Sequence, residues 1–383
     1  MPASPRSRTR TPIVQFGTSR FLQAHVDLFV SDAVAAGQDV GPITVVQTTG
    51  SAARAGRLQG FDGSPIPVVI RGLENGVPVE RTEYTRSIVR GLSAAADWDE
   101  IERIFVDEAT AVVSNTGDGG YRMADGETIG DGLPASFPAK LTKLLHARWR
   151  AKGAPLTLFP CELIGENGRV LAGLCAGTAE RSGLDAAFVR WLREECVWAN
   201  SLVDRIVSGS LEPAGAIAEP YALWAIERQP RLVVPLTHPA IRLVDDLRVA
   251  ERLKLFVLNL GHTALAERWI ADGRPRGETV REIIADREMR AFLDAIYDEE
   301  VLPVLIAAGI GEALAYRDTV IERFRNPFLD HRLADIADNH AAKKERRMGG
   351  VMQLAAEVAP GLKQPRLAAM AASGITGEIT SEG

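Results

Sequence analysis

The feature that most constrains the fold is a strand, a glycine turn, a helix and a second strand that follow one another near the N-terminus. Residues 13–16 (IVQF) are apolar enough for a buried strand, and Gly17 begins a polar turn. Residues 21–36 carry apolar side chains at helical spacing, and Gly37 ends the predicted helix. Residues 44–47 (TVVQ) predict the second strand. This order begins a parallel α/β domain, so we predict a Rossmann-type, mostly parallel sheet.

Later segments predict a β-hairpin inserted in that sheet and a change to helices towards the C-terminus. Asn75-Gly76 between the two β-like runs 68–71 and 77–80 is a strong signal for a tight hairpin turn. Two more buried strands are expected at 111–114 and 156–159. After about residue 235 the strand-like runs stop, and three long segments have helical periodicity: 248–271, 277–307 and 329–358.

The length of the chain, 383 residues, is too great for one ordinary core. We expect a disordered tail at 1–12, a Rossmann-type dinucleotide-binding domain at 13–235 and a mainly α-helical substrate and catalytic domain at 236–383. The active site is expected between the two domains, as in many α/β enzymes.

Composition excludes several classes of protein. The net charge of -6 argues against nucleic acid as the main partner, which would require an excess of Lys and Arg. No run of about 18 apolar residues is present, so we expect no membrane span, and the basic start lacks the apolar segment of a signal peptide. The three cysteines form no CxxC pair, which fits a reducing, cytoplasmic compartment. The six histidines and three cysteines do not cluster at ligand spacing, so no metal site is predicted. Oligomeric state is left open.

The turn after the first strand is a candidate site for a dinucleotide, because glycine permits close approach to a pyrophosphate and a helix N-terminus offers free N–H groups. In the segment 16–24 (FGTSRFLQA), however, only Gly17 matches the GxGxxG pattern. A plain strand–helix turn therefore stays an alternative. The candidate cofactor-binding residues are Gly17, Thr18, Ser19, Arg20 and Phe21 in this turn, Gln47 and Thr48 after the second strand, and Ser114, Asn115 and Thr116 after a later strand.

The end of the second strand bears on the choice between NAD and NADP. An Asp or Glu there would hold the ribose 2′-hydroxyl of NAD, but this strand ends in Gln47. Arg54 and Arg57 follow and could accept a 2′-phosphate, or they could belong to a solvated helix start. We expect NAD, with NADP as a possibility.

The segment 251–262 (ERLKLFVLNLGH) is the best candidate for chemistry. In an α-helix, at about 100° per residue, its polar groups Glu251, Lys254, Asn259 and His262 share less than half of the circumference, and the other positions are mostly apolar. Burial would lower the pKa of a lysine and make it a general base for an alcohol. An asparagine amide could donate to the developing alkoxide, a histidine could fix the substrate oxygen, and a glutamate could relay the proton. The alternative is a lysine that reaches the surface, with Asn and His satisfied in a core.

The same residues resemble the mannitol dehydrogenase family of long-chain polyol dehydrogenases. Lys254-x4-Asn259-x2-His262 is similar to the Lys/Asn/His signature of that family, and 15–25 (QFGTSRFLQAH) resembles its cofactor loop. The segment 199–205 (ANSLVDR) resembles another family motif, which implies that Asn200 is a second oxyanion donor; without the resemblance Asn200 would be interpreted as a helix cap. Glu251 is similar to a gating glutamate of some members.

Within this family the chain is most similar to the tagaturonate and fructuronate reductases. The segments that carry this resemblance are 70–73, 114–116, 159–164, 219–224 and 323–328. It implies metal-independent hydride transfer between NAD(P) and a secondary alcohol of a linear sugar acid, of the tagaturonate/altronate or fructuronate/mannonate type. A polyol dehydrogenase such as mannitol 2-dehydrogenase is the alternative enzyme. A non-catalytic NAD(P)-binding protein is the alternative of another class, and the intact Lys/Asn/His group argues against it.

The resemblance also suggests residues for the far end of the substrate. These are Lys343, Arg325 and Glu162. Lys343 belongs to a stretch, 339–343, that only loosely matches the segment where the family places a substrate-facing lysine. The alternative is that Lys343 is part of a solvated basic face, 343–347 (KKERR). The chain is also shorter than these reductases usually are, mainly in the helical domain.

Overall fold

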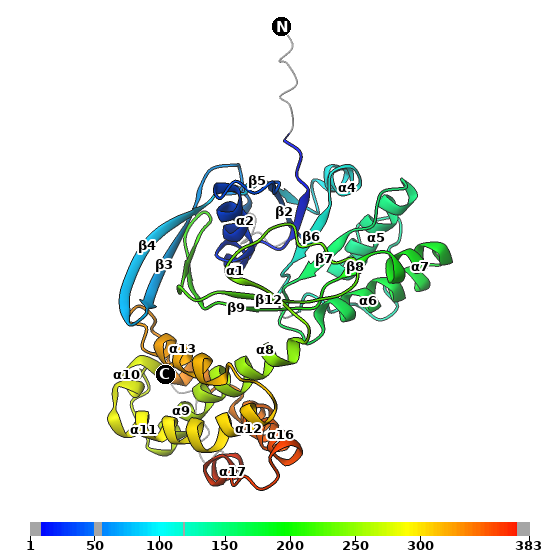
Figure 1. Cartoon of the computed structure of the whole chain (residues 1–383). Coiled ribbons are helices and arrows are strands. Elements are labelled where there is room, and N and C mark those ends of the chain that lie inside the picture. Colours follow the sequence, from blue (N-terminus) through cyan, green and yellow to red (C-terminus); the bar gives the residue numbers. More distant parts are fainter. Residues whose placement is uncertain (1–8, 50–55, 118, 374–383) are drawn as a thin grey trace, which may run out of the picture. The chain divides into compact units, whose positions relative to one another are not determined.

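The structure is a computed structural model of the whole chain (Figure 1). It describes residues 9–49, 56–117 and 119–373. The contacts within the chain divide it into two compact units. Unit 1 comprises Met1–Ile70 and Glu80–Leu247, and unit 2 comprises Arg71–Val79 and Arg248–Gly383. Each unit is described in turn.

Unit 1 is built on a six-stranded parallel sheet with the strand order β5-β2-β1-β6-β7-β8. The chain proceeds from β1 towards β5 on one side and from β6 towards β8 on the other. The order therefore reverses beside β1, which is the switch point where doubly wound sheets bind ligands. The predicted Rossmann-type fold is confirmed. The strands are β1 (Ile13–Phe16), β2 (Ile43–Gln47), β5 (Ile88–Ser93), β6 (Ala111–Ser114), β7 (Thr157–Pro160) and β8 (Val197–Trp198).

The strands of this sheet are runs of buried residues, whose side chains point alternately to its two faces, so both faces are buried. Val14 and Phe16 pack in one core with the helices α4 to α7, whereas Ile13 packs in another core with α2. Both faces are covered because adjacent side chains of a strand point in opposite directions. Figure 1 shows α5, α6 and α7 beside the strands β6 to β8. Helices of unit 1 whose whole length lies in the described residues are α1 (Arg20–Gln23), α2 (Val26–Ala35), α4 (Trp98–Asp107), α5 (Phe137–Arg150), α6 (Asn167–Arg181) and α7 (Ala186–Glu194).

The predicted single helix at 21–36 is interrupted, which corrects that expectation. α1 ends at Gln23 and α2 begins at Val26, with His25 outside helical geometry between them. The imidazole of His25 is buried against the rings of Phe21 at 4.8 Å and Phe29 at 4.5 Å, and its Nε2 lies 3.0 Å from the Leu223 carbonyl oxygen. Packing of this ring therefore accompanies the break, and burial lowers the pKa of His25 to about 3.

Two smaller sheets complete unit 1. The predicted hairpin is present and longer than expected, as β3 (Ile66–Glu74) and β4 (Val77–Thr85), with Asn75 at φ 53° and Gly76 at φ 77° in its two-residue turn. It extends a sheet with the order β10-β11-β3-β4, and a third sheet has the order β13-β12-β9. The sequence did not predict the other strands of these two sheets, nor β5 and β8 of the large sheet. The other strands of the two smaller sheets are β9 (Ser201–Asp204), β10 (Val207–Ser210), β11 (Ala216–Ala218), β12 (Leu223–Glu227) and β13 (Ile241–Val244).

Order begins before Ile13 within the part of the tail that the structure describes. Thr11 is buried, its N–H donates to Glu108 Oε2 at 2.7 Å, and its hydroxyl accepts a hydrogen bond from Thr44 Oγ1 at 2.8 Å. Residues 1–8 of the predicted disordered tail lie outside the described residues.

Unit 2 is helical apart from its hairpin segment, as the sequence predicts. Its core is formed by leucine, isoleucine and valine side chains from α8 to α17 together with Phe256, Tyr297 and Phe324. The hairpin tip 71–79 belongs with these helices: the Gly76 N–H donates to Glu322 Oε2 at 2.7 Å, and Asn326 Nδ2 donates to the Arg71 carbonyl at 3.4 Å. None of the helices in the described ranges has both the length and the apolar character that crossing a bilayer requires.

Three stretches are π-helical in the part of unit 2 that the structure describes, which the sequence did not predict. The π-helices are η1 (Lys254–Asn259), η2 (Tyr297–Val301) and η3 (Glu345–Gly349). Each continues directly from an α-helix into another. The α-helices are α8 (Leu247–Leu253), α9 (Leu260–Ala271), α10 (Val280–Ala285), α11 (Arg287–Ile296), α12 (Leu302–Ala307), α13 (Ala313–Phe324), α14 (Leu333–Ile336), α15 (His340–Lys344), α16 (Gly350–Val358) and α17 (Pro365–Ala372).

Candidate functional site

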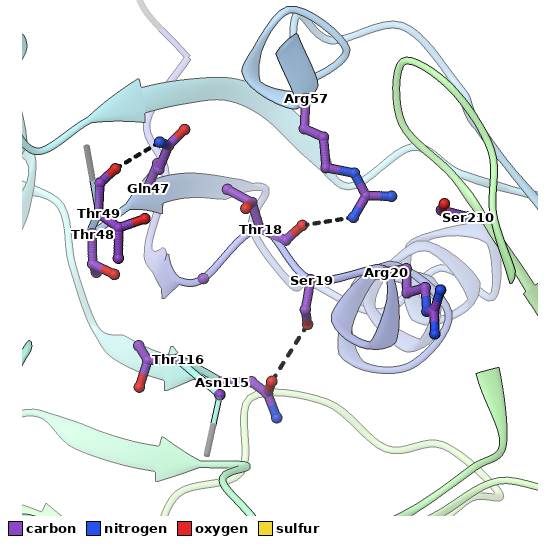
Figure 2. A pocket seen from close by; sticks show the side chains of 12 residues that line it. Thr18, Ser19, Arg20, Gln47, Thr48, Thr49, Arg57, Asn115, Thr116 and Ser210 are labelled. Atoms are coloured by element: carbon purple, nitrogen blue, oxygen red, sulfur yellow. Dashed lines mark hydrogen bonds between the residues drawn. The ribbon is translucent and has the colours of Figure 1, made fainter. Parts of the chain in front are cut away.

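A pocket of about 300 Å³ lies at the carboxyl ends of β1, β2 and β6 in unit 1 (Figure 2). This is the switch point of the sheet, and the volume lies at the low end of the range for ligand sites. Eight of the ten predicted cofactor-binding residues line the pocket: Gly17, Thr18, Ser19, Arg20, Gln47, Thr48, Asn115 and Thr116. The other lining residues are Thr49, Gly117 and Ser210, which the sequence did not point to, and Arg57, which it offered as a possible contact of a 2′-phosphate.

Gly17 brings the chain from β1 close to the turn after β6. Its φ is +117°, and a Cβ atom at this position would lie 2.3 Å from the Asn115 carbonyl oxygen. Only glycine fits both the backbone angle and the space. Ser19 then caps α1 by accepting a hydrogen bond from the Leu22 N–H at 3.3 Å, and its hydroxyl also donates to Asn115 Oδ1 at 3.4 Å, as Figure 2 shows.

Glu162 holds the turn after β6 from inside the protein. Its carboxylate is buried and accepts hydrogen bonds from Ser114 Oγ and from both the N–H and the hydroxyl of Thr116, each at 3.0 Å, and from the Tyr121 hydroxyl at 3.2 Å. These bonds hold the pocket-lining turn in place. The role of Glu162 as a substrate-binding residue stays a prediction. Ser114 is likewise buried and turned to Glu162 instead of lining the pocket.

Phe21 is the second predicted cofactor residue that does not line the pocket. Its ring stacks on His25, on the α1 side of the turn. Asn115, by contrast, is held at the pocket by its own amide, because Nδ2 donates to the Cys161 carbonyl at 2.7 Å. The sequence could not separate residues that line the pocket from those that do not, because a position near the end of a strand does not reveal the direction of its side chain.

The polar character of the pocket fits a phosphorylated ligand. Among the described residues that line it, Arg20 and Arg57 are cationic and none is Asp or Glu. Arg57 Nη1 donates to the Thr18 carbonyl at 3.3 Å, and Gln47 Nε2 donates to the Thr49 carbonyl at 2.6 Å (Figure 2). The strand β2 ends in Gln47 and not in an acid, and Arg57 lies on the pocket wall nearby. Arg54, named with Arg57 in the sequence, lies outside the described residues.

Asn200 is buried between β8 and β9 in unit 1, and its amide is engaged on both sides. Oδ1 accepts from the Arg169 N–H in the first turn of α6 at 3.0 Å, and Nδ2 donates to Glu227 Oε2 at 2.8 Å. Asn200 therefore acts as a cap, although for α6 and not for a helix of its own. Its role as an oxyanion donor stays a prediction, and Glu227 is a partner that the sequence did not point to.

The segment with Glu251, Lys254, Asn259 and His262 is not a regular α-helix. It runs from α8 through η1 into α9, and Lys254 and Asn259 are the two ends of η1. The Leu260 N–H reaches back to the Leu255 carbonyl, five residues earlier. In an α-helix residues four apart lie one turn apart, and the i→i+5 bonds of a π-helix give this relation to residues five apart.

The π-turn therefore brings the four polar residues closer to one face than the predicted geometry did. Glu251 and Lys254 are three apart at the end of α8, Lys254 and Asn259 five apart in η1, and Asn259 and His262 three apart at the start of α9. Each step is about one turn of its local helix. At 100° per residue, an α-helix would place Lys254 and Asn259 about 140° apart around its axis. This value does not apply to the π-turn.

Burial along this face differs from the expectation. His262 is buried, whereas Lys254, Asn259 and Glu251 are only half-buried. Lys254 thus lies between the two alternatives that the sequence left open, a buried lysine and one that reaches the surface. The His262 ring packs on Phe324 at 4.4 Å and edge-on against His331 at 4.8 Å. Burial, and then the charges of His331 and nearby arginines, holds the pKa of His262 well below its usual range. At neutral pH this imidazole is therefore uncharged.

The groups that act electrostatically on His262 form a basic cluster, which comprises His331, Arg323, Lys343 and Arg347. Burial lowers the pKa of His331, so the two arginines and the lysine carry the positive charge of the cluster at neutral pH. Lys343 is half-buried and its Nζ donates to the Ile336 carbonyl at 2.8 Å. Burial, followed by the charge of Arg347, lowers the pKa of Lys343. Burial likewise lowers the pKa of Arg347 to about 10. The run 343–347 is thus not a uniformly solvated face.

Arg325 does not belong to this basic cluster. It is exposed at the end of α13, whereas Arg323 is buried on the same helix as Val320 and Phe324. Arg325 as a substrate-binding residue stays a prediction, and Arg323 is a buried basic residue that the sequence analysis did not single out. Helical periodicity contains this signal, because Arg323 adjoins the apolar positions of α13 and Arg325 lies beyond its last residue.

Across the described ranges, no three or more His, Cys, Asp or Glu side chains are grouped so that they could hold a metal ion. The two units instead offer a pocket suited to phosphate groups and a helical face with an amine, an amide and a neutral imidazole. An amine can take or give a proton, an amide can donate to an oxygen that gains negative charge, and an imidazole can fix a hydroxyl.

Two family models match the chain. The mannitol dehydrogenase Rossmann domain matches residues 68–235, and the mannitol dehydrogenase C-terminal domain matches residues 246–376. The altronate oxidoreductase of Klebsiella pneumoniae subsp. pneumoniae is 34% identical over 93% of this chain and 77% of its own length. That of Halalkalibacterium halodurans is 31% identical over 88% of this chain and 69% of its own length.

Solved structures support the fold. A D-sorbitol dehydrogenase in substrate-free form superposes with a TM-score of 0.81, at 23% identity, over 94% of this chain and 79% of its own. The mannitol 2-dehydrogenase of Pseudomonas fluorescens, in a ternary complex with NAD and D-mannitol, has a TM-score of 0.72 at 20% identity over 96% of this chain and 79% of its own.

Proposed function

Because this chain belongs to the mannitol dehydrogenase family, we propose that it is an NAD-dependent oxidoreductase that interconverts a secondary alcohol and a ketone of a linear sugar acid. The relatives named above are altronate oxidoreductases, so the proposed pair is an altronate-type aldonate and its keto form. The observation that carries the choice of an acid over a neutral polyol is the basic cluster around His262, which attracts a carboxylate.

The pocket of unit 1 is proposed to hold the cofactor. Gly17 permits close approach of a pyrophosphate to the backbone, and Ser19, Arg20 and Asn115 provide polar groups around it. A nicotinamide held there would supply the acceptor for the hydride of the alcohol carbon in oxidation and its donor in reduction. Arg57 on the pocket wall is compatible with a 2′-phosphate, so NADPH belongs in the assay beside NADH.

The residues of the α8–η1–α9 segment are proposed to handle the substrate oxygen. In oxidation Lys254 Nζ takes the hydroxyl proton as the C–H hydride leaves, and in reduction it returns that proton to the oxygen. The Asn259 amide donates to this oxygen while negative charge develops on it, and Asn200 is proposed as a second donor. The uncharged His262 orients the oxygen, and Glu251, one turn before Lys254, exchanges the proton with solvent.

Lys343 is proposed to bind the carboxylate end of the substrate with the rest of the basic cluster. It is the member of the cluster that the sequence also pointed to, and its partial burial strengthens its field on a bound anion. Arg323, buried beside Phe324, adds to the positive potential at the same place. The proposed ligand is therefore a small anionic sugar derivative.

The test compares substrates that differ in charge. Purified protein is assayed with NADH and with NADPH against tagaturonate, fructuronate, fructose and fructose 6-phosphate. We expect turnover of a uronate with a kcat/KM at least tenfold above that of fructose. Equal or better turnover of fructose would assign the chain to the neutral polyols. Absence of turnover with all four, while NADH binds, would refute the proposal.

Two variants test the assigned residues. Lys254→Ala should lower kcat by roughly 10²- to 10⁴-fold, the usual contribution of a general acid–base group, without weakening NADH binding. Lys343→Gln should raise KM for the uronate but leave fructose kinetics unchanged. The exposed Arg346, which lies in the same run, provides the matched control as Arg346→Gln.

A further inference from the structure

Two side chains from elsewhere in unit 2 donate hydrogen bonds to backbone carbonyls of the π-helical turn η1. The backbone bonds of a π-turn join residues five apart instead of four, and such turns occur frequently at functional sites. Both of the other π-helices, η2 and η3, contact η1. Each supplies one donor to a backbone carbonyl of η1, and these two donors are Tyr297 and Arg347.

Tyr297 is the first residue of η2 and is fully buried. Its hydroxyl donates to the Val257 carbonyl in the middle of η1 at 2.8 Å. The Leu260 N–H also donates to this carbonyl, and it divides its hydrogen bond between the Val257 and Leu255 carbonyls. Burial raises the pKa of the Tyr297 phenol far above its usual range, so the hydroxyl keeps its proton and remains a donor.

Gly261 leaves the space that this hydroxyl occupies. A Cβ atom on Gly261 would lie 1.9 Å from the Tyr297 hydroxyl oxygen and 3.1 Å from its Cζ. Gly261 is the second residue of α9 and directly precedes His262. The glycine, whose cost in a helix is about 1 kcal/mol relative to alanine, thus permits the tyrosine to reach the carbonyl.

Arg347 in η3 holds the other end of the turn. Its Nη1 donates to the Asn259 carbonyl at 3.0 Å and to Thr263 Oγ1 at 2.6 Å. The Thr263 hydroxyl itself donates to the Asn259 carbonyl at 3.1 Å. The last carbonyl of η1 is therefore held from two directions, next to the Asn259 side chain that is proposed to contact the substrate oxygen.

We propose that Tyr297 and Arg347 are positioning residues, which keep η1 in its π-helical register and thereby hold Lys254 and Asn259 one turn apart on the same face. This inference rests on the proposed roles of Lys254 and Asn259. Without the two donors, the Val257 and Asn259 carbonyls lose bonds that stabilise the wider turn. A return to α-helical spacing separates the two groups by about 140° around the axis, too far apart to act on one oxygen atom.

The first test removes one atom. Tyr297→Phe retains the buried ring and deletes only the hydroxyl. We expect kcat to fall roughly tenfold to a hundredfold, the effect expected of a catalytic group displaced by about 1 Å, with the KM for NADH unchanged. Thr279→Ala, which breaks the capping box of α10, is the control for lost stability alone, and it should lower Tm without lowering kcat.

The second test uses the close approach at Gly261. Gly261→Ala should lower both Tm and kcat, because its methyl group displaces the Tyr297 hydroxyl. Adding Tyr297→Phe removes the closest contact, at 1.9 Å, and leaves only contacts of 3.1 Å to ring atoms of residue 297 and Phe324. The double variant should therefore regain part of the lost Tm while its kcat stays at the level of Tyr297→Phe. This pattern separates packing from positioning, because Tm and kcat respond differently in the double variant.

A third variant addresses Arg347. Arg347→Met should lower kcat at saturating substrate, and Arg347→Lys, which retains a cationic donor, should restore part of it. Wild-type kcat in Tyr297→Phe, or return of the Gly261→Ala/Tyr297→Phe variant to wild-type kcat, would overturn the inference. Because all variants are compared with a wild-type enzyme that turns over a uronate, failure of the proposed function is seen first and separately.

Discussion

Asp27 on α2 provides a direct test of how burial sets the pH dependence of stability in unit 1. Its side chain is fully buried, and Gln15 Nε2 donates to Oδ2 at 3.3 Å. Among the described residues no donor reaches Oδ1. Burial raises the pKa of Asp27 from 3.8 to about 7, and the bond from Gln15 offsets only part of this effect. The native protein therefore keeps this carboxyl protonated at a pH where the unfolded chain has released the proton.

The sign and size of the effect follow from the two pKa values. Between pH 4 and pH 7 the native state binds the proton and the unfolded state does not, so the free energy of unfolding falls as the pH rises. A difference of about three pKa units, at 1.36 kcal/mol each, corresponds to about 4 kcal/mol lost by pH 7 to 8. Asp27→Asn removes the ionisable group and should abolish this loss.

The assay is urea unfolding of the wild type and Asp27→Asn from pH 4 to pH 8. The two free energies should agree within about 1 kcal/mol at pH 4 and diverge to about 4 kcal/mol at pH 8, with the asparagine variant more stable. Asp32→Asn, exposed on the same helix, is the matched control and should follow the wild type. Parallel curves for wild type and Asp27→Asn would refute the assignment of a raised pKa to burial.

Two further predictions concern the cofactor pocket, and both are measured by fluorescence titration with NADH. Gly17→Ala should abolish binding and lower Tm, because its methyl group meets the Asn115 carbonyl, whereas Gly37→Ala, with open space around it, should retain binding and cost only backbone strain of about 1–3 kcal/mol. Glu162→Gln should weaken binding roughly tenfold, since charged hydrogen bonds contribute about 1.5–3 kcal/mol each. The exposed Glu166→Gln should bind normally, and equal affinity in both glutamate variants would contradict the role of Glu162.

The sequence predicted β1, β2, β6 and β7 of the central sheet because the signal of these strands is local, whereas β5 and β8 were missed. Residues 13–16 and 111–114 are short apolar runs, and a parallel strand buried on both faces requires such a run. The hairpin was predicted because the Asn75-Gly76 turn requires positive φ at both positions. The strands β9 to β13 were missed because they are short and alternate with polar residues and loops.

The candidate site was predictable in its residue types but not in its geometry. The apolar spacing of 251–262 is equally compatible with an α-helix and a π-turn, and the choice depends on donors such as Tyr297 that lie far away in the sequence. The engagement of Glu162 is invisible for the same reason, because Ser114 and Tyr121 meet it only in the folded sheet. The role of a residue that acts through tertiary contacts can thus be recognised only once the fold is known.

The hairpin tip 71–79 has a consequence for how the protein is made. It packs with the helices of unit 2, and its contact from Gly76 to Glu322 spans 246 residues of chain. During synthesis the tip leaves the ribosome well before its partners on α13 exist, so unit 2 acquires this contact only after nearly the whole chain has been translated. A cut at residue 247 cannot yield two complete units. The N-terminal fragment would carry the hairpin tip 71–79, and the C-terminal fragment would lack this segment of unit 2.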